Sequence, residues 1–486
     1  MKSILFSHSY FLRFDPKQWK TGQPYAPLGT LYAASLMREN GYKVSLFDTM
    51  FAHEPTEVIK EIEEVKPDLF VIYDDGFNYL TKMCLTNMRE AAFRMIELAK
   101  QRGCIVMVSS SDSTDNYAKY IEHGADFILL GEAEHTLLEL TNAIKNNHTN
   151  YISIEGIAFK ENGKITKTSK RNVIKDLDSL PLPAWDLVDI EPYKKMWLKS
   201  TGYFSMNMGT TRGCPFKCNW CAKPIYGNRY NSRSPENVIS ELKMLKKKFE
   251  FDHIWFCDDI FGLKPGWVRH FADLVESEKL SFKFKIQARA DLLLEEGHIK
   301  DLARAGCDDV WMGAESGSQK ILDAMDKGTT IEQIYSATRL LKKHGIKPSF
   351  FIQFGYLNET KEDIEKTIQM INTLLPYNIG ISVSYPLPGT KFYEKVKADL
   401  KEKTNWTDSD ELHLMFHNTY KPSFYKQLYR YVHKTYRSHI AWDTFLNMLK
   451  HPSSISLQAL KKAASIAYNV PAAFFAKRKL TMLEKA

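Results

Sequence analysis

The sequence predicts an α/β protein with two successive sheets of parallel strands and a helical C-terminal region. Residues 1–150, and again about 203–390, alternate short apolar runs rich in β-branched residues with amphipathic stretches. This alternation is typical of parallel sheets whose strands are joined by crossover helices. Beyond Gly389 the pattern becomes helical, polar and rich in Tyr and Lys. With 486 residues, the chain is long enough for about two to four domains.

The first block has the pattern of a Rossmann-like, doubly wound sheet. Its amphipathic stretches Leu28–Asn40 and Asn87–Gln101 are long enough to be crossover helices. Ligands of such sheets bind beyond the carboxyl ends of the strands. No Gly-x-Gly-x-x-Gly follows the first strand, so a nicotinamide or flavin dinucleotide has no specific support. The five predicted strands are Ser3–Ser7, Lys43–Phe47, Asp68–Tyr73, Cys104–Val108 and Phe127–Leu130.

The second block predicts a partial or complete parallel barrel of six strand–helix units. Barrels of this kind carry their chemistry at the C-terminal ends of the strands. The predicted strands are Ser205–Gly209, His253–Cys257, Lys283–Ala288, Asp309–Gly313, Ser349–Phe354 and Ile379–Val383. The predicted helices are Pro235–Lys248, Gly266–Glu278, Glu295–Ala305, Ile331–His344 and Lys361–Leu375.

A connector separates the two blocks. It contains a predicted hairpin around Asn162-Gly163 and a proline-rich run, Asp178–Asp186, whose prolines forbid regular structure. We therefore expect a Rossmann-like domain over residues 1–150, a connector over 151–200, a barrel over 201–395 and a helical, basic region over 396–486.

The positive charge of the chain is concentrated at its C-terminal end. The formal net charge is +8, but residues 421–486 hold 12 Lys and Arg against only Asp443 and Glu484. A hydrophobic fraction of 44% and a charged fraction of 26% are ordinary for a globular protein. The sequence has neither a long apolar run nor a secretion signal, and its seven Cys do not have the spacing of a disulfide framework. We expect a cytoplasmic protein.

Three cysteines form a compact motif directly after the first strand of the second block. Cys214, Cys218 and Cys221 have the spacing C-x₃-C-x₂-C, in a loop that Gly213 and Pro215 open. Thiolates in this arrangement suit zinc or an iron–sulfur cluster. A closed zinc site needs a fourth Cys or His. Three ligands alone leave one iron of a [4Fe–4S] cluster open, whereas a structural zinc with a distant fourth ligand is the alternative.

With Trp220 as its aromatic residue, the motif C-x₃-C-x-aromatic-C resembles the signature of the radical S-adenosylmethionine (SAM) enzymes. The resemblance implies that Cys214, Cys218 and Cys221 hold a catalytic [4Fe–4S] cluster. It also implies that SAM chelates the open iron and is cleaved reductively to a 5′-deoxyadenosyl radical. In this family the position of Trp220 packs near the SAM adenine, and flavodoxin or ferredoxin supplies the electron.

Polar residues at the successive strand ends match positions of the same family. The resemblance implies cofactor contacts for Asp258, Asp259, Arg289, Glu315, Ser316, Gly355 and Pro388. Simpler readings stay open, because Asp258 and Asp259 suit helix capping and Arg289 suits a structural ion pair. Their occurrence together at successive strand ends favours the site.

A Rossmann-like domain before such a barrel resembles the cobalamin-binding class of radical SAM enzymes. The overall layout is similar to the anaerobic magnesium-protoporphyrin monomethyl ester cyclase-like branch, which includes methyltransferases. The motif Asp-x-His-x-x-Gly, whose His coordinates cobalt, does not occur. The resemblance therefore implies cobalamin bound without a His ligand; a domain that binds no cobalamin is the alternative. The matching segments are Ala26–Gly29, Gly41–Asp48, Gly124–Glu134 and Leu177–Asp186.

The resemblance implies C-methylation of an unactivated carbon on a small-molecule or lipid-like substrate. Ring closure or rearrangement by the same class is one alternative, and a non-catalytic metal- or corrinoid-binding protein is another. No nucleic-acid-binding motif occurs. Helical spacing over Phe424–Tyr436 fits either a packed face or a helix closing over the barrel mouth. Basic and apolar residues in Ser456–Lys479 fit peripheral contact with an anionic membrane or a solvated end.

Overall fold

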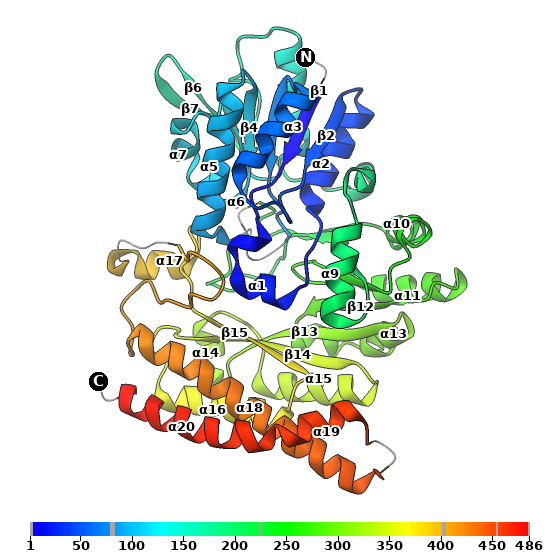
Figure 1. Cartoon of the computed structure of the whole chain (residues 1–486), viewed down its shortest axis with the longest axis vertical. Helices are drawn as coiled ribbons and strands as arrows, with labels where there is room; N and C mark the ends of the chain where they lie inside the picture. The colour runs from blue at the N-terminus through cyan, green and yellow to red at the C-terminus, as the bar shows by residue number, and fades with distance from the viewer. Residues whose placement is uncertain (1–2, 78–82, 224, 401–404, 453–454, 485–486) are drawn as a thin grey trace.

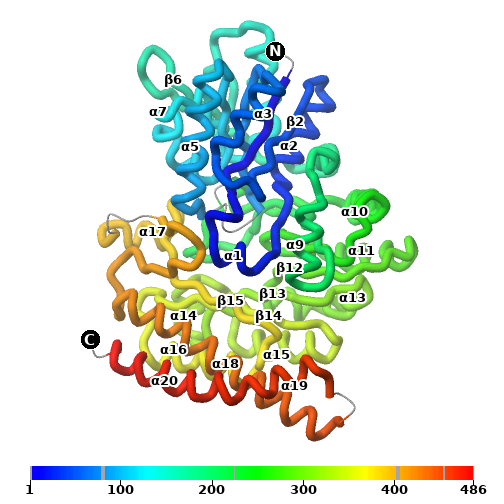
Figure 2. Tube along the Cα trace, viewed as in Figure 1, coloured from blue at the N-terminus to red at the C-terminus, as the bar shows by residue number. Residues whose placement is uncertain are grey.

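The computed structural model describes residues 3–77, 83–223, 225–400, 405–452 and 455–484. Two large sheets follow one another along the long axis of the molecule, and a layer of C-terminal helices lies beyond the second (Figure 1). The chain runs from the first sheet through the second to these helices, as the colours of Figure 2 show. The predicted α/β class is confirmed.

The first sheet has the strand order β2-β1-β3-β4-β5-β6-β7, and β1 to β5 are parallel. All five predicted strands form: β1, β3, β4 and β5 are apolar runs buried between helices, whereas β2 is an edge strand and is only partly buried. They are β1 (Ser3–Ser7), β2 (Lys43–Phe47), β3 (Leu69–Tyr73), β4 (Ile105–Ser109) and β5 (Phe127–Leu129). The main helices are α2 (Leu28–Glu39), α3 (Val58–Val65), α5 (Thr86–Gln101), α6 (Ser111–Asp115), α7 (Tyr117–Glu122) and α8 (Glu134–Lys145).

The predicted hairpin forms as β6 (Ile157–Glu161) and β7 (Lys164–Lys167), and β6 pairs antiparallel with β5. The first sheet therefore continues past residue 150 to Lys167, so the hairpin belongs to this sheet and not to a connector. The rest of the connector includes a helix that the sequence analysis did not predict, α9 (Glu191–Thr201). The indole of Trp197 in this helix donates a 2.7 Å hydrogen bond to the Pro24 carbonyl.

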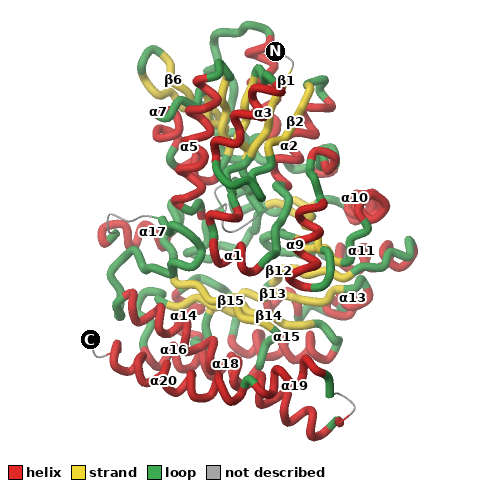
Figure 3. Tube along the Cα trace, in the orientation of Figure 1, coloured by secondary structure: helices red, strands yellow, loops and turns green. Residues whose placement is uncertain are grey.

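The second sheet is a half-barrel of six parallel strands in the order β15-β14-β13-β12-β11-β8. Figure 3 shows its strands β12, β13, β14 and β15 in yellow, with the helices α14, α15 and α16 below them. Among the described strands, β8 and β15 each have one neighbour in this sheet, so the predicted barrel is partial. The strands are β8 (Ser205–Met208), β11 (His253–Phe256), β12 (Lys283–Ala288), β13 (Cys307–Glu315), β14 (Lys347–Phe354) and β15 (Asn378–Val383). The helices are α10 (Pro235–Phe249), α11 (Trp267–Ser277), α12 (Ala290–Leu293), α13 (His298–Arg304), α14 (Gln319–Ala324), α15 (Ile331–Lys343), α16 (Lys361–Leu374) and α17 (Lys391–Val396).

The two faces of the half-barrel differ in burial. One set of alternate residues, such as Ile286 and Met312, is fully buried in the core that the strands share with the surrounding helices. The other set is only partly buried, as in the patterns of β12 and β15. Since successive side chains point to opposite faces, the second set forms an inner face with contact to solvent. It includes Trp255, Lys285, Gln287, Trp311, Phe351 and Ser382.

The C-terminal region forms α18 (Pro422–Lys450), α19 (Leu457–Ala464) and α20 (Ile466–Glu484). Helix α18 packs against α16, and its Tyr436 hydroxyl donates to the carbonyls of Pro376 and Tyr377, just before β15 begins. Tyr425, near the start of the helix, lies beside Gly355 after β14, so residues 424–436 run along the barrel as a buried, packed face. The barrel mouth faces the carboxyl end of the first sheet. No helix in the described ranges is long and apolar enough to cross a bilayer.

Candidate active site

The cysteine motif lies in the loop between two short strands, β9 (Thr211–Arg212) and β10 (Asn231–Ser232), which pair antiparallel. Gly213 opens this loop with φ of +81°, and a Cβ atom there would lie 2.3 Å from the Arg229 carbonyl oxygen. Only glycine fits such a position. The paired strands β9 and β10 therefore hold the two ends of the cysteine loop together, and Gly213 sets its first turn.

Asn219 anchors the middle of the loop to three other parts of the barrel. Its amide nitrogen donates to the Ala324 carbonyl at 2.7 Å, and its side-chain oxygen accepts from the Tyr356 hydroxyl at 2.7 Å. Its backbone carbonyl accepts from the Phe392 N–H at 2.9 Å. Sequence analysis did not select Asn219, because all these partners are more than 100 residues away.

The three cysteines form no disulfide with any cysteine that the structure describes, and each is partly exposed. Burial raises the pKa of Cys214, with a further contribution from the nearby Cys218. Among the described residues no set of three metal-binding side chains is already gathered around one point. The donor set nevertheless fits an iron–sulfur cluster, because three thiols share one short loop and cationic groups lie beside it.

Arg289 directly follows β12 and lies next to this loop. Its guanidinium is 3.7 Å from the Phe216 ring and within 4.0 Å of the Cys218 sulfur. It also forms an ion pair with Asp291 at 3.0 Å. Arg289 thus forms the structural ion pair and also lies beside the cysteine loop, so both interpretations of this residue apply.

Glu315 ends β13 in a left-handed conformation, with φ of +57°. Its carboxylate lies 2.7 Å from the ammonium of Lys327, and both side chains are buried. Burial opposes the charge on Lys327, but the Glu315 carboxylate and the nearby Cys218 raise the pKa of the lysine. Lys327 therefore places a second positive charge near Cys218. Sequence analysis missed this residue.

Asp258 and Asp259 follow β11. Asp258 is fully buried and accepts hydrogen bonds from the Thr210 N–H, the Thr210 hydroxyl and the Thr211 N–H. Burial raises its pKa to about 6 in spite of these bonds. Asp258 thus holds the segment that leads into the cysteine loop, whereas Asp259 is partly exposed and contributes to the raised pKa of Cys214.

The other predicted site residues border the same end of the barrel. Ser316 is fully buried and its hydroxyl is 3.1 Å from that of Thr367. Gly355 has φ of +76°, and its N–H donates to Glu359 at 2.6 Å. Trp220 is partly buried, and its indole N–H has no hydrogen-bond partner in the described part of the chain. Pro388 lines a cavity.

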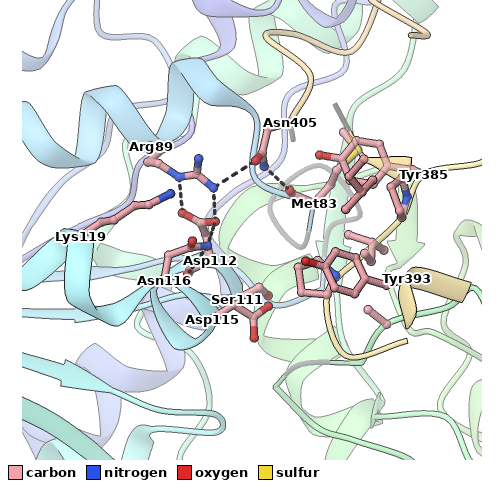
Figure 4. A pocket seen from close by; sticks show the side chains of 15 residues that line it. Met83, Arg89, Ser111, Asp112, Asp115, Asn116, Lys119, Tyr385, Tyr393 and Asn405 are labelled. Carbon is pink, nitrogen blue, oxygen red and sulfur yellow. Dashed lines mark hydrogen bonds and ion pairs between the residues drawn. The ribbon is translucent and has the colours of Figure 1, made fainter. Parts of the chain in front are cut away.

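The cavity lies between the two sheets (Figure 4). Arg89 and Asp112 form an ion pair on one wall, and Tyr385 and Tyr393 lie on the opposite wall. Burial raises the pKa of Asp115 in this wall to about 6, so a carboxyl that exchanges protons near neutrality borders the cavity. Its lining includes Ser111 and Asp112, after β4, Ala222, next to Cys221, and Pro386–Pro388, after β15.

A buried ion-pair cluster, also missed by the sequence analysis, joins the two sheets beside this site. The Arg212 guanidinium lies 2.6 Å from Glu132 and 2.7 Å from Glu134, and the three side chains are at most 3% exposed. Arg212 ends β9, two residues before Cys214, whereas both acids follow β5. The carboxyl ends of the two sheets therefore face each other.

The fold and the cysteine loop define a class of enzyme. Residues 208–371 match the family model of the Radical SAM superfamily, a segment that begins at the end of β8 and contains the three cysteines. The barrel therefore carries a Radical SAM domain, and a [4Fe–4S] cluster and SAM are the cofactors of this class of enzyme. The predicted enzyme class is confirmed.

Two curated relatives are similar over most of the chain. One is named an uncharacterized methyltransferase of Pyrococcus horikoshii; it is 29% identical over 388 residues, which cover 78% of this chain and 80% of that protein. The other is the anaerobic magnesium-protoporphyrin IX monomethyl ester cyclase of Rubrivivax gelatinosus; it is 25% identical over 387 residues, which cover 76% and 66%.

A solved structure shares the fold over nearly the whole chain. It is the cobalamin-dependent S-adenosylmethionine radical enzyme OxsB with aqua-cobalamin bound. Its TM-score is 0.74 at 17% identity, and the match covers 98% of this chain and 72% of that one. This likeness confirms the predicted architecture of a Rossmann-like sheet, a partial barrel and a helical C-terminal region.

Proposed function

We propose that this chain is a cobalamin-dependent radical SAM enzyme that methylates an unactivated carbon of a small-molecule substrate. The observation that carries the proposal is the cavity between the two sheets. It joins the loops after β4, where a Rossmann-like sheet binds its ligand, to the cysteine loop of the barrel. The named methyltransferase relative supports methyl transfer. Ring closure or rearrangement is the second candidate, because the other relative is named a cyclase.

In this proposal Cys214, Cys218 and Cys221 hold the [4Fe–4S] cluster. With SAM bound, the cluster supplies a 5′-deoxyadenosyl radical, and cobalamin supplies the methyl group. Arg289 and Lys327 place positive charge beside Cys218, one of the proposed cluster ligands. The predicted SAM contacts are Trp220, Asp258, Asp259, Arg289, Glu315, Ser316, Gly355 and Pro388.

Of these contacts, Asp258 and Ser316 act through their neighbours. Asp258 holds the backbone of Thr210 and Thr211, and Ser316 is bonded within the protein to Thr367. Glu315, in its left-handed conformation, holds Lys327 at the mouth of the barrel. These residues position the loop and its charges, and Trp220 remains the candidate for contact with the adenine.

The end of the first sheet fits a corrinoid bound without a histidine ligand. The hydroxyls of Tyr10 and Tyr25 are buried there and have no hydrogen-bond partner within the described ranges. A bound polar cofactor would satisfy such groups. His8, at the end of β1, is already engaged, because its ring lies 2.8 Å from Asp48 and bonds to Thr49.

The partners of the reaction follow from the same proposal. Flavodoxin or ferredoxin supplies the electron, and nucleic acid is not a partner. A lipid-like substrate and peripheral contact with an anionic membrane are supported by the C-terminal helices. Twelve of the seventeen large apolar side chains that are exposed in the described structure lie between residues 442 and 482. The exposed basic residues among them are Lys450, Lys461, Lys462, Lys477, Arg478 and Lys479.

Anaerobic reconstitution tests the radical chemistry. The wild-type chain should bind about four irons and, with SAM and a strong reductant, form 5′-deoxyadenosine. Cys214→Ala should lose both, whereas Cys104→Ala, in the core of the first sheet, should retain both. Stoichiometric zinc without iron, or no 5′-deoxyadenosine from the iron-loaded protein, would contradict the proposal.

Two further measurements test cobalamin and methylation. After reconstitution with hydroxocobalamin, the protein should retain a corrinoid spectrum through gel filtration; loss of all corrinoid would indicate an enzyme without cobalamin. A methyltransferase should convert SAM both to 5′-deoxyadenosine and to S-adenosylhomocysteine, because one SAM is cleaved and another gives its methyl group. Formation of 5′-deoxyadenosine alone would favour the cyclase.

A further inference from the structure

One cation on the inner face of the half-barrel, Lys285, lies opposite Asp309 in the strand register but forms no ion pair with it. Lys285 lies in the middle of β12, and its ammonium is 4.6 Å from the centre of the Trp255 ring and 5.8 Å from that of Trp197. Among the described residues no carboxylate forms an ion pair with it. The acid that attracts it most is Asp309, on β13, whose carboxylate accepts a 2.7 Å hydrogen bond from Ser349.

Other lysines near the barrel sheet are neutralised. Lys347, on β14, forms an ion pair with Asp308 at 2.8 Å, and Lys327 forms one with Glu315 at 2.7 Å. A lysine that served only to hold the fold together would be expected to have such a partner, because a buried charge without one costs folding free energy. Lys285 differs from both.

The surroundings of Lys285 are aromatic and keep contact with solvent. Trp311 and Phe351 lie on the same inner face, with ring centres 4.8 Å apart. Trp255, Lys285, Trp311 and Phe351 are each only partly buried. Aromatic side chains beside an ammonium that forms no ion pair suit a flat apolar molecule with one negative charge.

Strand β12 connects this cation to the reaction centre. Lys285 lies four residues before Arg289, which borders the cysteine loop at the end of the same strand. At 3.3 Å per residue in a parallel strand, the two backbone positions are roughly 13 Å apart. A molecule of that length would contact Lys285 at one end and place a carbon near the cofactors at the other.

We propose that the inner face of the half-barrel binds the substrate and that Lys285 binds a carboxylate on a substrate with a flat apolar body. This inference rests on the proposed function, since it names the substrate class of the same site. A single ammonium matches one carboxylate in charge. Trp255 and Trp197 hold the ammonium in place, and Trp311 and Phe351 provide surface for the apolar body.

Two probes that differ in charge test this role. The anaerobically reconstituted protein is dialysed to equilibrium against 2-naphthoate, which carries a carboxylate, or 2-naphthamide, which is uncharged and of nearly the same shape. We expect the wild type at pH 7 to bind 2-naphthoate about tenfold more tightly, as a charge-assisted hydrogen bond implies. Because this measurement needs no turnover, it can fail while 5′-deoxyadenosine is still formed, or succeed while it is not.

Three variants make the result specific. Lys285→Met keeps the length of the side chain and should bind both probes equally, whereas Lys285→Arg keeps the charge and should retain most of the preference. Lys347→Met removes a neutralised lysine and should leave the preference unchanged. Circular dichroism checks that each variant is folded. Equal binding of the two probes by the wild type, or a preference that persists in Lys285→Met, would overturn the proposal.

Discussion

At the scale of single residues, Asn219 is expected to control cluster binding although it is not a ligand. Its side chain bonds to Ala324 and Tyr356 in a fully packed environment. Asn219→Ala removes both bonds, at a cost of about 1 kcal/mol for each, because the Tyr356 hydroxyl and the Ala324 carbonyl stay bonded only to each other. We predict that this variant binds less than half the iron of the wild type after reconstitution. Asn228→Ala, which removes an exposed bond to Lys223, is the control and should bind normally.

Lys285 gives a residue-scale prediction about stability and pH. Burial lowers its pKa from 10.5 to about 8, even though Asp309 and Cys257 attract the ammonium. Because the folded pKa is lower than the unfolded one, the cost to stability is full below pH 8 and fades as the pH rises toward 10. Such a shift corresponds to about 3 kcal/mol as an upper value.

We therefore predict that Lys285→Met unfolds at a higher temperature than the wild type at pH 7, and that the difference shrinks at pH 9.5. Thermal unfolding followed by circular dichroism at both pH values measures this. His253, which is bonded to Ser205, has its pKa lowered to about 3 by burial and stays neutral over this range. If Lys285→Met unfolded at the same or a lower temperature than the wild type at pH 7, interactions of the ammonium would offset the cost of burying it.

At the scale of elements, the link between the two sheets depends on β9. Arg212 in this strand is the only described cation that forms ion pairs with Glu132 and Glu134, and its guanidinium also lies 5.3 Å from the Tyr32 ring. Arg212→Met should lower the free energy of unfolding by about 3–5 kcal/mol, because two buried carboxylates lose their partner. Urea unfolding measures this loss.

The matched control for Arg212→Met is Arg38→Met. Arg38 pairs with Asp186 on the surface, where both side chains are well exposed, so its loss should cost at most about 1 kcal/mol. Adding Glu132→Gln and Glu134→Gln to Arg212→Met should recover part of the stability, since the uncompensated charges are removed. If Arg212→Met were as stable as Arg38→Met, the buried cluster would not hold the two sheets together.

Helices and strands were predictable where the local pattern of apolar residues alone determines which side chains are buried. The strand Lys283–Ala288 was predicted to the residue, because its alternation is set by the two faces of the sheet. The helix α9 and the attachment of the hairpin to β5 were not predicted, because both depend on which distant segment covers them. Lys327 and Arg212 were missed for the same reason: their acidic partners lie 12 to 80 residues away.

Those parts of the site that lie in a sequence motif or directly after a strand were predictable from the sequence. The cysteine spacing and the positions after β11, β12 and β13 indicated the right end of the barrel. The sequence could not show that the Asp258 carboxylate accepts hydrogen bonds from backbone N–H groups, or that Ser316 bonds to Thr367. Such roles depend on how loops from separate strand ends meet, which local patterns do not encode.

At the scale of the whole molecule, the excess positive charge lies at the end opposite to the first sheet (Figure 1). Helix α20 packs along α18, and Glu484 pairs with Lys361 of the barrel. Deleting residues 453–486 would therefore uncover α18 as well as remove exposed side chains. Substitutions on the outer surface test membrane contact more cleanly. Phe474 and Phe475 are 65% and 64% exposed, next to Lys477.

We predict that Phe474→Ser combined with Phe475→Ser weakens co-sedimentation with vesicles that contain phosphatidylglycerol by about tenfold, because two aromatic side chains no longer enter the interface. The same variant should form 5′-deoxyadenosine at the wild-type rate, since these residues lie far along the chain from the cysteine loop and on the outer helices. The control Tyr377→Ser removes an aromatic side chain that is 58% exposed on the barrel and should leave sedimentation unchanged. Equal sedimentation of the wild type with neutral phosphatidylcholine vesicles, or no loss in the double variant, would show that these helices do not bind an anionic membrane.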